Sequence, residues 1–136
     1  MQKGNVVSRN DKSAKYEKGL AVRKAVLGDE YVNRALASAD DFSQTLQDWV
    51  TEQAWGEVWT DDTIPRKTRS MLNVALLATL NRPHELRLHL RGALTNGVSR
   101  KEIAAVLIHC GVYCGAPVAV DSFRIAREVF AELDKQ

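Results

Sequence analysis

A carboxylate and an imidazole stand one turn apart on a predicted helix that spans residues 83–96. At 100° per residue, Glu85 and His89 lie along one edge of the apolar stripe of this helix, together with Arg82. They therefore flank the predicted core instead of facing open water. The pairing predicts an acid/base site, and the neighbouring arginine adds a partner for anions.

The apolar stripe consists of Leu86, Leu90 and Ala93. Arg87 and Arg91 lie on its other side. Guanidinium groups bind carboxylates through two parallel hydrogen bonds, so these arginines are further candidates for holding an acidic substrate. For each one, the alternative is an exposed or inter-subunit ion pair.

A second candidate acid lies earlier in the chain, where Glu52, Trp55 and Trp59 share a face if the preceding helix runs on. A carboxylate between two indole rings could have a raised pKa and donate a proton. The alternative is that both tryptophans anchor the core or a subunit interface, with Glu52 on a wet rim. The spacing favours this second interpretation.

Helices have to position all of these side chains, because no stretch shows a two-residue alternation of apolar and polar residues. The sequence predicts an all-α protein of six to seven helices. The predicted helices span residues 16–27, 31–39, 41–55, 66–80, 83–96, 100–113 and 117–133. Asp29 and Asp40 are candidate N-caps, and Ser99 with Glu102 forms a capping box. We expect a single domain over residues 16–136, preceded by a flexible tail at residues 1–15.

The composition is that of an ordinary globular protein, with 136 residues, 45% hydrophobic content and 26% charged residues. The net charge is only +2 and the basic residues are dispersed, which gives no support for a nucleic-acid partner. No apolar run is long enough for a membrane span, and no secretory signal is visible. Helices 66–80 and 100–113 are apolar on nearly every side, so we expect a homo-oligomer to cover them.

The two cysteines, Cys110 and Cys114, are four residues apart on one predicted helix. This spacing is not the C-x-x-C of a dithiol redox site. Two cysteines also make no disulfide framework, so a reducing cytoplasm is the expected location. The simplest interpretation is two small buried hydrophobic residues.

Several short motifs, in order along nearly the whole chain, resemble 4-carboxymuconolactone decarboxylases. They are Val22-Arg-Lys-Ala-Val-Leu-Gly-Asp, Ala54-Trp-Gly-Glu-Val-Trp-Thr, Arg66-x-x-Arg69-Ser, Glu85-Leu-Arg-Leu-His-Leu-Arg, Asn96-Gly-Val and Tyr113-Cys-Gly-Ala-Pro. The resemblance implies an alkylhydroperoxidase-D-like helical fold and homo-oligomers of three or six subunits. It also implies decarboxylation of 4-carboxymuconolactone, a small anionic lactone, to the enol-lactone of 3-oxoadipate in aromatic-acid catabolism (the β-ketoadipate pathway), with no metal or organic cofactor.

Peroxide-handling members of the wider superfamily carry Cys-x-x-Cys-x-x-x-His at the start of the equivalent helix. Here the histidine falls on His89, but the cysteine positions hold Arg82 and Glu85. Neither side chain can supply the thiolate that such chemistry needs. The resemblance therefore favours the decarboxylase branch. The Pro-Ala-Ala-Asn run of the decarboxylases reads Pro117-Val-Ala-Val-Asp121 here, so a related lactone acid is a possible substrate.

Within this reaction we expect His89 to act as general acid or oxyanion donor. Glu85 would orient the imidazole and favour its charged form, and Glu52 is a second proton donor. The expected substrate-binding residues are Arg91, Arg66, Arg82, Trp55, Trp59 and Tyr113. His84 and His109 are expected to be structural. The alternatives are a thiol-dependent peroxide or disulfide reductase using Cys110 and Cys114, and a non-catalytic oligomer that binds a small molecule.

Overall fold

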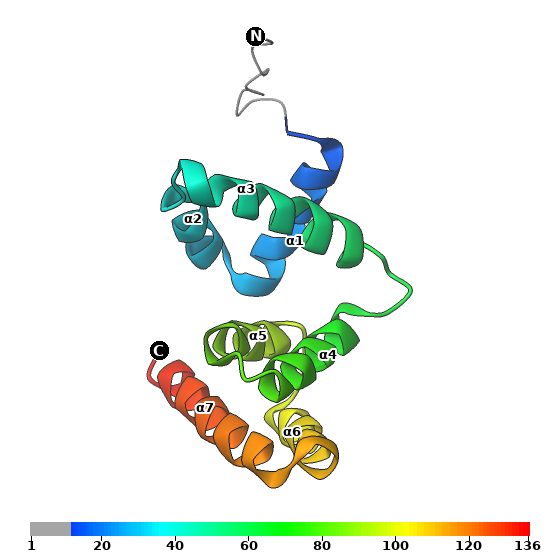
Figure 1. The fold of residues 1–136 in the computed structure, drawn as a ribbon, viewed down its shortest axis with the longest axis vertical. Coiled ribbons are helices and arrows are strands. Elements are labelled where there is room, and N and C mark those ends of the chain that lie inside the picture. The colour runs from blue at the N-terminus through cyan, green and yellow to red at the C-terminus, as the bar shows by residue number, and fades with distance from the viewer. Residues whose placement is uncertain (1–11) are drawn as a thin grey trace. The chain divides into compact units, whose positions relative to one another are not determined.

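The structure, a computed structural model, describes residues 12–136, and every regular element within them is a helix (Figure 1). This confirms the predicted all-α class. The chain forms two compact units, one ending at Asp61 and the other running from Asp62 to Gln136. Residues 1–11 of the predicted tail lie outside the described residues, and the first helix already begins at Ala14.

The first unit contains α1 (Ala14–Leu27), α2 (Asp29–Ala37), α3 (Asp41–Trp49) and the π-helix η1 (Val50–Val58). Helix α1 begins two residues before the predicted start, because the Ser13 side chain accepts a hydrogen bond from the Tyr16 N–H and caps it. Helix α2 also begins early. Its cap position is held by Gly28 at φ 91°, so the prediction that Asp29 caps this helix is wrong. The predicted cap at Asp40 is confirmed.

The predicted third helix does run on to Trp59, but its hydrogen bonding changes from α to π at Val50. The Trp59 N–H donates to the carbonyl of Ala54, five residues back, at 3.0 Å. Two glycines let the backbone of α1 lie in direct contact with the backbone of this segment. A Cβ on Gly19 would lie 2.1 Å from the Thr51 carbonyl oxygen, and one on Gly56 would lie 2.4 Å from the Lys15 carbonyl oxygen.

The second unit contains α4 (Arg66–Thr79), α5 (Pro83–Thr95), α6 (Arg100–Cys114) and α7 (Ala116–Asp134). These bounds lie within one residue of the predicted ones, because strong local signals mark each helix end. The capping box of Ser99 and Glu102 is confirmed at the start of α6. No helix within residues 12–136 is long and apolar enough to cross a membrane.

Helices α4 and α5 both end in Schellman motifs. After α4, the Arg82 N–H donates to the Leu77 carbonyl and the Asn81 N–H to the Ala78 carbonyl. Asn81 has φ 56°, a left-handed conformation that asparagine tolerates better than most residues. This turn places Arg82 at the N-cap of α5 and Pro83 at its first position. It therefore sets where the functional helix begins, that is, α5 with Glu85 and His89.

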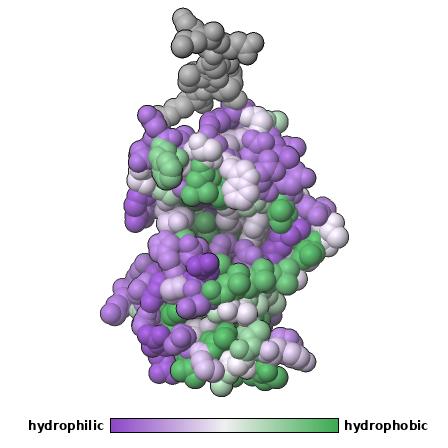
Figure 2. All heavy atoms as spheres, viewed as in Figure 1, coloured by the Kyte–Doolittle hydropathy of each residue, from purple (hydrophilic) through white to green (hydrophobic). Residues whose placement is uncertain are grey.

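The second unit has its own hydrophobic core, to which all four of its helices contribute. The predicted apolar stripe of α5 is confirmed, since Leu86, Leu90 and Ala93 are at most 2% exposed. Helices α4 and α6, which the sequence predicts to be apolar on nearly every side, are not fully covered within a single chain. Apolar side chains remain exposed on α4 and its C-cap (Leu72, Leu76, Leu80) and on α6 (Ile108, Val112, Tyr113). Figure 2 shows such apolar residues at the surface between polar ones.

Candidate active site

His89 lies on α5 and is held from α4 by a residue that the sequence analysis did not single out. The Asn73 side chain reaches His89, with Nδ2 3.4 Å from the ring atom Nδ1. With the proton of the neutral ring on Nε2, Nδ1 accepts a hydrogen bond from this amide nitrogen. Asn73 had one signal in the sequence: it belongs, with Arg66 and Ser70, to the polar line of an otherwise apolar helix.

Burial lowers the pKa of His89 from 6.5 to about 4, and the nearby charge of Glu85 raises it by a smaller amount. We expected Glu85 to favour the charged imidazole. Its charge does act in that direction, but the cost of desolvating a cation is larger. His89 is therefore neutral at pH 7. In this state it can donate a hydrogen bond to developing negative charge but carries no proton ready for transfer.

Glu85 is exposed on the first turn of α5, and it forms no hydrogen bond or ion pair with any residue from 12 to 136. The expected orientation of the His89 ring by Glu85 is therefore not seen. Asn73 provides the observed contact instead.

The candidate arginines fall into two groups. Arg91 forms an ion pair with Glu132, and Arg87, one turn earlier on α5, forms one with Glu128. Both arginines therefore bind carboxylates of α7. Arg66 and Arg82 are exposed and have no ion pair within residues 12–136. A carboxylate substrate would have to compete with a glutamate for Arg91 but not for Arg66 or Arg82. The sequence places Arg91 beside Arg66 and Arg82 as a candidate, because a partner 41 residues away gives no local signal.

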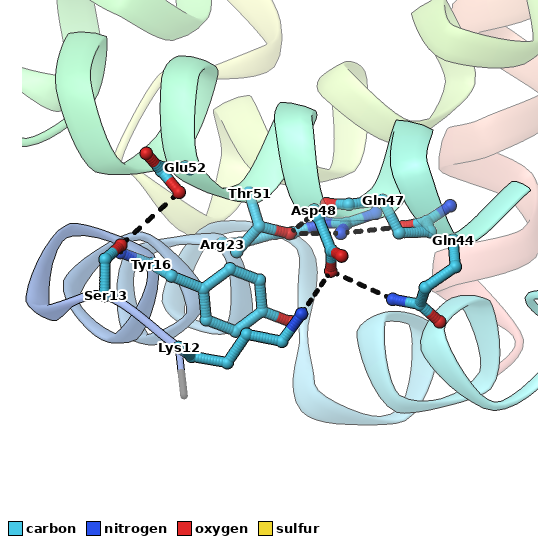
Figure 3. A network of polar contacts seen from close by, with 9 residues as sticks. All are labelled: Lys12, Ser13, Tyr16, Arg23, Gln44, Gln47, Asp48, Thr51 and Glu52. Atoms are coloured by element: carbon cyan, nitrogen blue, oxygen red, sulfur yellow. Dashed lines mark hydrogen bonds and ion pairs between the residues drawn. The ribbon is translucent and has the colours of Figure 1, made fainter. Parts of the chain in front are cut away.

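Glu52, in the first unit, is half-buried and accepts a hydrogen bond from the Ser13 hydroxyl at 3.3 Å (Figure 3). Trp55 and Trp59 are 4% and 6% exposed, and their rings stack with centroids 4.8 Å apart. Together with Val22 and Val26 they form the core of this unit. The packing matches the interpretation of the tryptophans as core anchors. Their role in substrate binding stays a prediction.

A polar network beside Glu52 surrounds a buried arginine (Figure 3). Arg23 is 5% exposed and donates from Nη1 to the Gln47 Oε1 at 2.9 Å and the Thr51 Oγ1 at 3.1 Å. Burial lowers the pKa of its guanidinium, but an arginine keeps its proton at neutral pH. Thr51 in turn donates to the Gln47 carbonyl. This network fixes α1 against α3 and η1.

The remaining candidates lie on α6. Tyr113 is 77% exposed, and its ring lies 4.8 Å from that of His109. Cys110 is buried, with its Sγ 3.8 Å from the Ala75 carbonyl oxygen, whereas Cys114 is exposed and both thiols are free. The buried position of Cys110 matches the interpretation of a small hydrophobic residue, whereas the same interpretation is wrong for the exposed Cys114. A substrate contact through Tyr113 stays a prediction.

Comparison with known proteins identifies the class. The sequence model of the carboxymuconolactone decarboxylase family matches residues 44–128, which include α4, α5 and α6 completely. The chain therefore belongs to the carboxymuconolactone decarboxylase family, which confirms the resemblance seen in the sequence.

Two relatives match over most of this chain, and a third matches over a shorter part of it. A 4-carboxymuconolactone decarboxylase of Acinetobacter baylyi is 43% identical over 119 residues, which are 88% of this chain and 89% of that protein. A nitrosuccinic acid decarboxylase of Metarhizium robertsii is 39% identical over 118 residues, 87% of this chain and 82% of that protein. A 4-carboxymuconolactone decarboxylase of Pseudomonas putida is 40% identical over 47 residues, 35% of this chain and 98% of that sequence.

Proposed function

We propose that this protein is a carboxy-lyase that removes CO2 from 4-carboxymuconolactone and gives the enol-lactone of 3-oxoadipate. The observation that carries the proposal is the neutral, half-buried His89, anchored by Asn73 on the functional helix. It stands in a chain that is 43% identical to a 4-carboxymuconolactone decarboxylase over nearly all of its length. The reaction belongs to aromatic-acid catabolism.

The substrate supplies its own electron sink, which is why the reaction needs no cofactor. As the carbon–carbon bond to the leaving carboxylate breaks, its electron pair moves through the ring toward the lactone carbonyl oxygen. The protein must hold an anion, stabilise the developing oxyanion and deliver a proton to carbon. Hydrogen-bond donors that are already in place before the reaction are the most effective way to stabilise such charge.

His89 supplies such a donor through its Nε2 proton. A neutral imidazole can stabilise an enolate-like oxygen without transferring its proton, because its own pKa is far below the working pH. Asn73 acts as the positioning residue, since its amide fixes the tautomer. The proton for carbon comes from a carboxylic acid, for which Glu85 and Glu52 are the candidates. Arg66 and Arg82 bind substrate carboxylate groups.

The nitrosuccinic acid decarboxylase relative gives a second candidate substrate. Nitrosuccinic acid, like 4-carboxymuconolactone, keeps one carboxylate when the other leaves as CO2. In both molecules an electron-withdrawing group receives the negative charge. The Val120-Asp121 departure in the predicted pocket is a reason to test both acids.

The deciding experiment incubates the purified protein with 4-carboxymuconolactone and, separately, with nitrosuccinate, and follows absorbance and CO2 release. Turnover that disappears in His89→Ala but persists in His84→Ala supports the proposal. His84 is the matched control, since it is an exposed histidine on the same helix. No turnover of either acid by a folded protein contradicts the proposal. Consumption of hydroperoxide that depends on Cys110 and Cys114 would instead favour the thiol alternative.

We also propose that the protein works as a homo-oligomer, a trimer or hexamer, in the cytoplasm. The supporting observation is the row of exposed leucines along α4 and at its C-cap: Leu72, Leu76 and Leu80 are 47%, 56% and 63% exposed. Apolar residues repeated at this spacing form one uncovered face, which a second copy can bury. Sedimentation of the native protein and of Leu76→Glu tests this. A native monomer at micromolar concentration contradicts the proposal.

A further inference from the structure

A cavity of about 130 Å³ lies in the second unit, between the end of α4, the turn into α5 and the first half of α7. It has room for several water molecules or for a carboxylate with a short carbon chain. Its apolar wall includes Leu86, Val118 and Ile125. Its polar side chains are Asn81, Arg82, Asp121 and Ser122, so apolar and polar groups face the same space.

Ser122 is the unusual residue in this cavity. Its side chain is only 2% exposed, yet its hydroxyl has no hydrogen-bond partner among residues 12–136. The other buried polar residues of the described chain each form at least one side-chain hydrogen bond: Arg23 donates from Nη1 to Thr51, although its Nε has no partner, and Ser70 accepts from Asn96 at 2.9 Å. The Ser122 Oγ is not among the fully enclosed side-chain atoms that lack a partner, so it opens onto the cavity that the residue lines and is available to a group that enters there.

The charge around the cavity favours an anion. Arg82 lines it without an ion pair in the described part of the chain, and the Schellman turn at Asn81 holds Arg82 at the N-terminus of the 13-residue α5. The positive end of a helix dipole adds to the guanidinium charge. Asp121 also lines the cavity, but its carboxylate is compensated by Arg124, whose Nη2 lies 3.1 Å from Oδ1.

We propose that this cavity binds a carboxylate of a small organic acid, with Arg82 as the ionic partner and the Ser122 hydroxyl as a hydrogen-bond donor. The carbon chain next to that carboxylate packs against Leu86, Val118 and Ile125. The assignment rests on the proposed function in one respect: the bound group is the carboxylate that the substrate keeps after CO2 has left. Ser122 is thus a binding residue that determines specificity for acids with two carboxylates.

The binding test uses succinate, a stable acid with two carboxylates, titrated into the full-length protein and followed by NMR of the backbone amides and the Arg82 Nε. We expect saturable shifts at Arg82 and Ser122. Ser122→Ala, which removes only the hydroxyl, should weaken succinate binding about tenfold, because the lost hydrogen bond is to a charged group. Arg82→Gln should weaken it at least as much. Arg127→Gln, an exposed arginine of α7 outside the cavity, is the control and should bind like the native protein.

Asp121→Asn provides a test in the opposite direction. It removes a negative charge from the cavity wall and should tighten succinate binding several-fold. Equal affinity in the native protein, Ser122→Ala and Arg82→Gln would overturn the proposal and leave the cavity as a site for water. Saturable succinate shifts confined to other residues would overturn it as well.

Kinetics separate this inference from the proposed function. If the protein decarboxylates a lactone acid, Ser122→Ala should raise KM about tenfold and leave kcat within twofold. An unchanged KM with normal turnover leaves the decarboxylase function standing and removes the carboxylate site. Succinate binding that needs Ser122 and Arg82, in a protein without decarboxylase activity, supports the site and contradicts the function.

Discussion

The amide nitrogen Nδ2 of Asn73 lies 3.4 Å from Nδ1 of His89, which joins α4 to the functional helix α5. When Nδ1 accepts from this amide, Nε2 is the ring nitrogen that can donate a hydrogen bond. The contact also means that His89 and its positioning residue both come from the second unit.

Replacing His89 with alanine should lower kcat by about two orders of magnitude or more, because a single donor to a developing oxyanion is worth roughly 3–4 kcal/mol. Asn73→Leu should lower kcat by a smaller factor, since it leaves the ring in place but frees its tautomer. Steady-state kinetics on the lactone substrate measure both, with circular dichroism to check the fold. Unchanged turnover in a folded His89→Ala protein would remove this residue from the mechanism.

Stability should depend on pH through His89. Its pKa is about 4 in the folded protein and 6.5 in the unfolded chain, so between these values the unfolded chain binds a proton that the folded protein does not. The stability is full above pH 6.5 and falls as the pH drops toward 4, by at most about 3 kcal/mol. Urea unfolding of the native protein and of His89→Gln at pH 7.5 and 4.5 measures the difference. The same loss in both proteins would show that His89 is not responsible.

Substitutions of the candidate arginines should change KM by different amounts, depending on whether the arginine already has an ion-pair partner. Arg66→Ala should raise KM more than Arg91→Ala, because Arg91 is already paired with Glu132. Glu132→Gln frees the Arg91 guanidinium and is the matched control: it should leave KM unchanged or lower it. A larger effect of Arg91→Ala on KM than of Arg66→Ala would show that the substrate displaces Glu132.

Gly19→Ala should destabilise the first unit by several kcal/mol, or prevent its folding. The added Cβ would lie 2.1 Å from the Thr51 carbonyl oxygen, which belongs to backbone and cannot move aside without moving η1. Ala21→Ser, at an exposed position of the same helix, should change stability by less than about 0.5 kcal/mol. Thermal unfolding of both variants checks this. Native-like melting of Gly19→Ala would mean that α1 and η1 pack differently.

The helices of the second unit could be predicted from sequence, because caps such as Ser99, the break at Pro83 and the stripe of Leu86 and Leu90 are local signals. The chemistry around His89 was only partly predictable. The spacing of the sequence places Glu85 one turn before His89. The size of the desolvation effect on the pKa of His89, however, depends on neighbours from other helices. The Asn73 contact and the Arg91–Glu132 pair join residues 16 and 41 positions apart, which no local pattern encodes.

The number of residues in the π-helix over Val50–Val58 determines where the side chain of Trp59 lies. A π-helix closes each hydrogen bond around one residue more than an α-helix, so one residue could be removed here and the helix would remain continuous. The helix beyond the deletion would then rotate by about 100°, and Trp59 would leave its stack on Trp55. Homologues one residue shorter in this segment should therefore carry their second aromatic residue at a shifted position, and an alignment that places the gap elsewhere would pair the wrong residues.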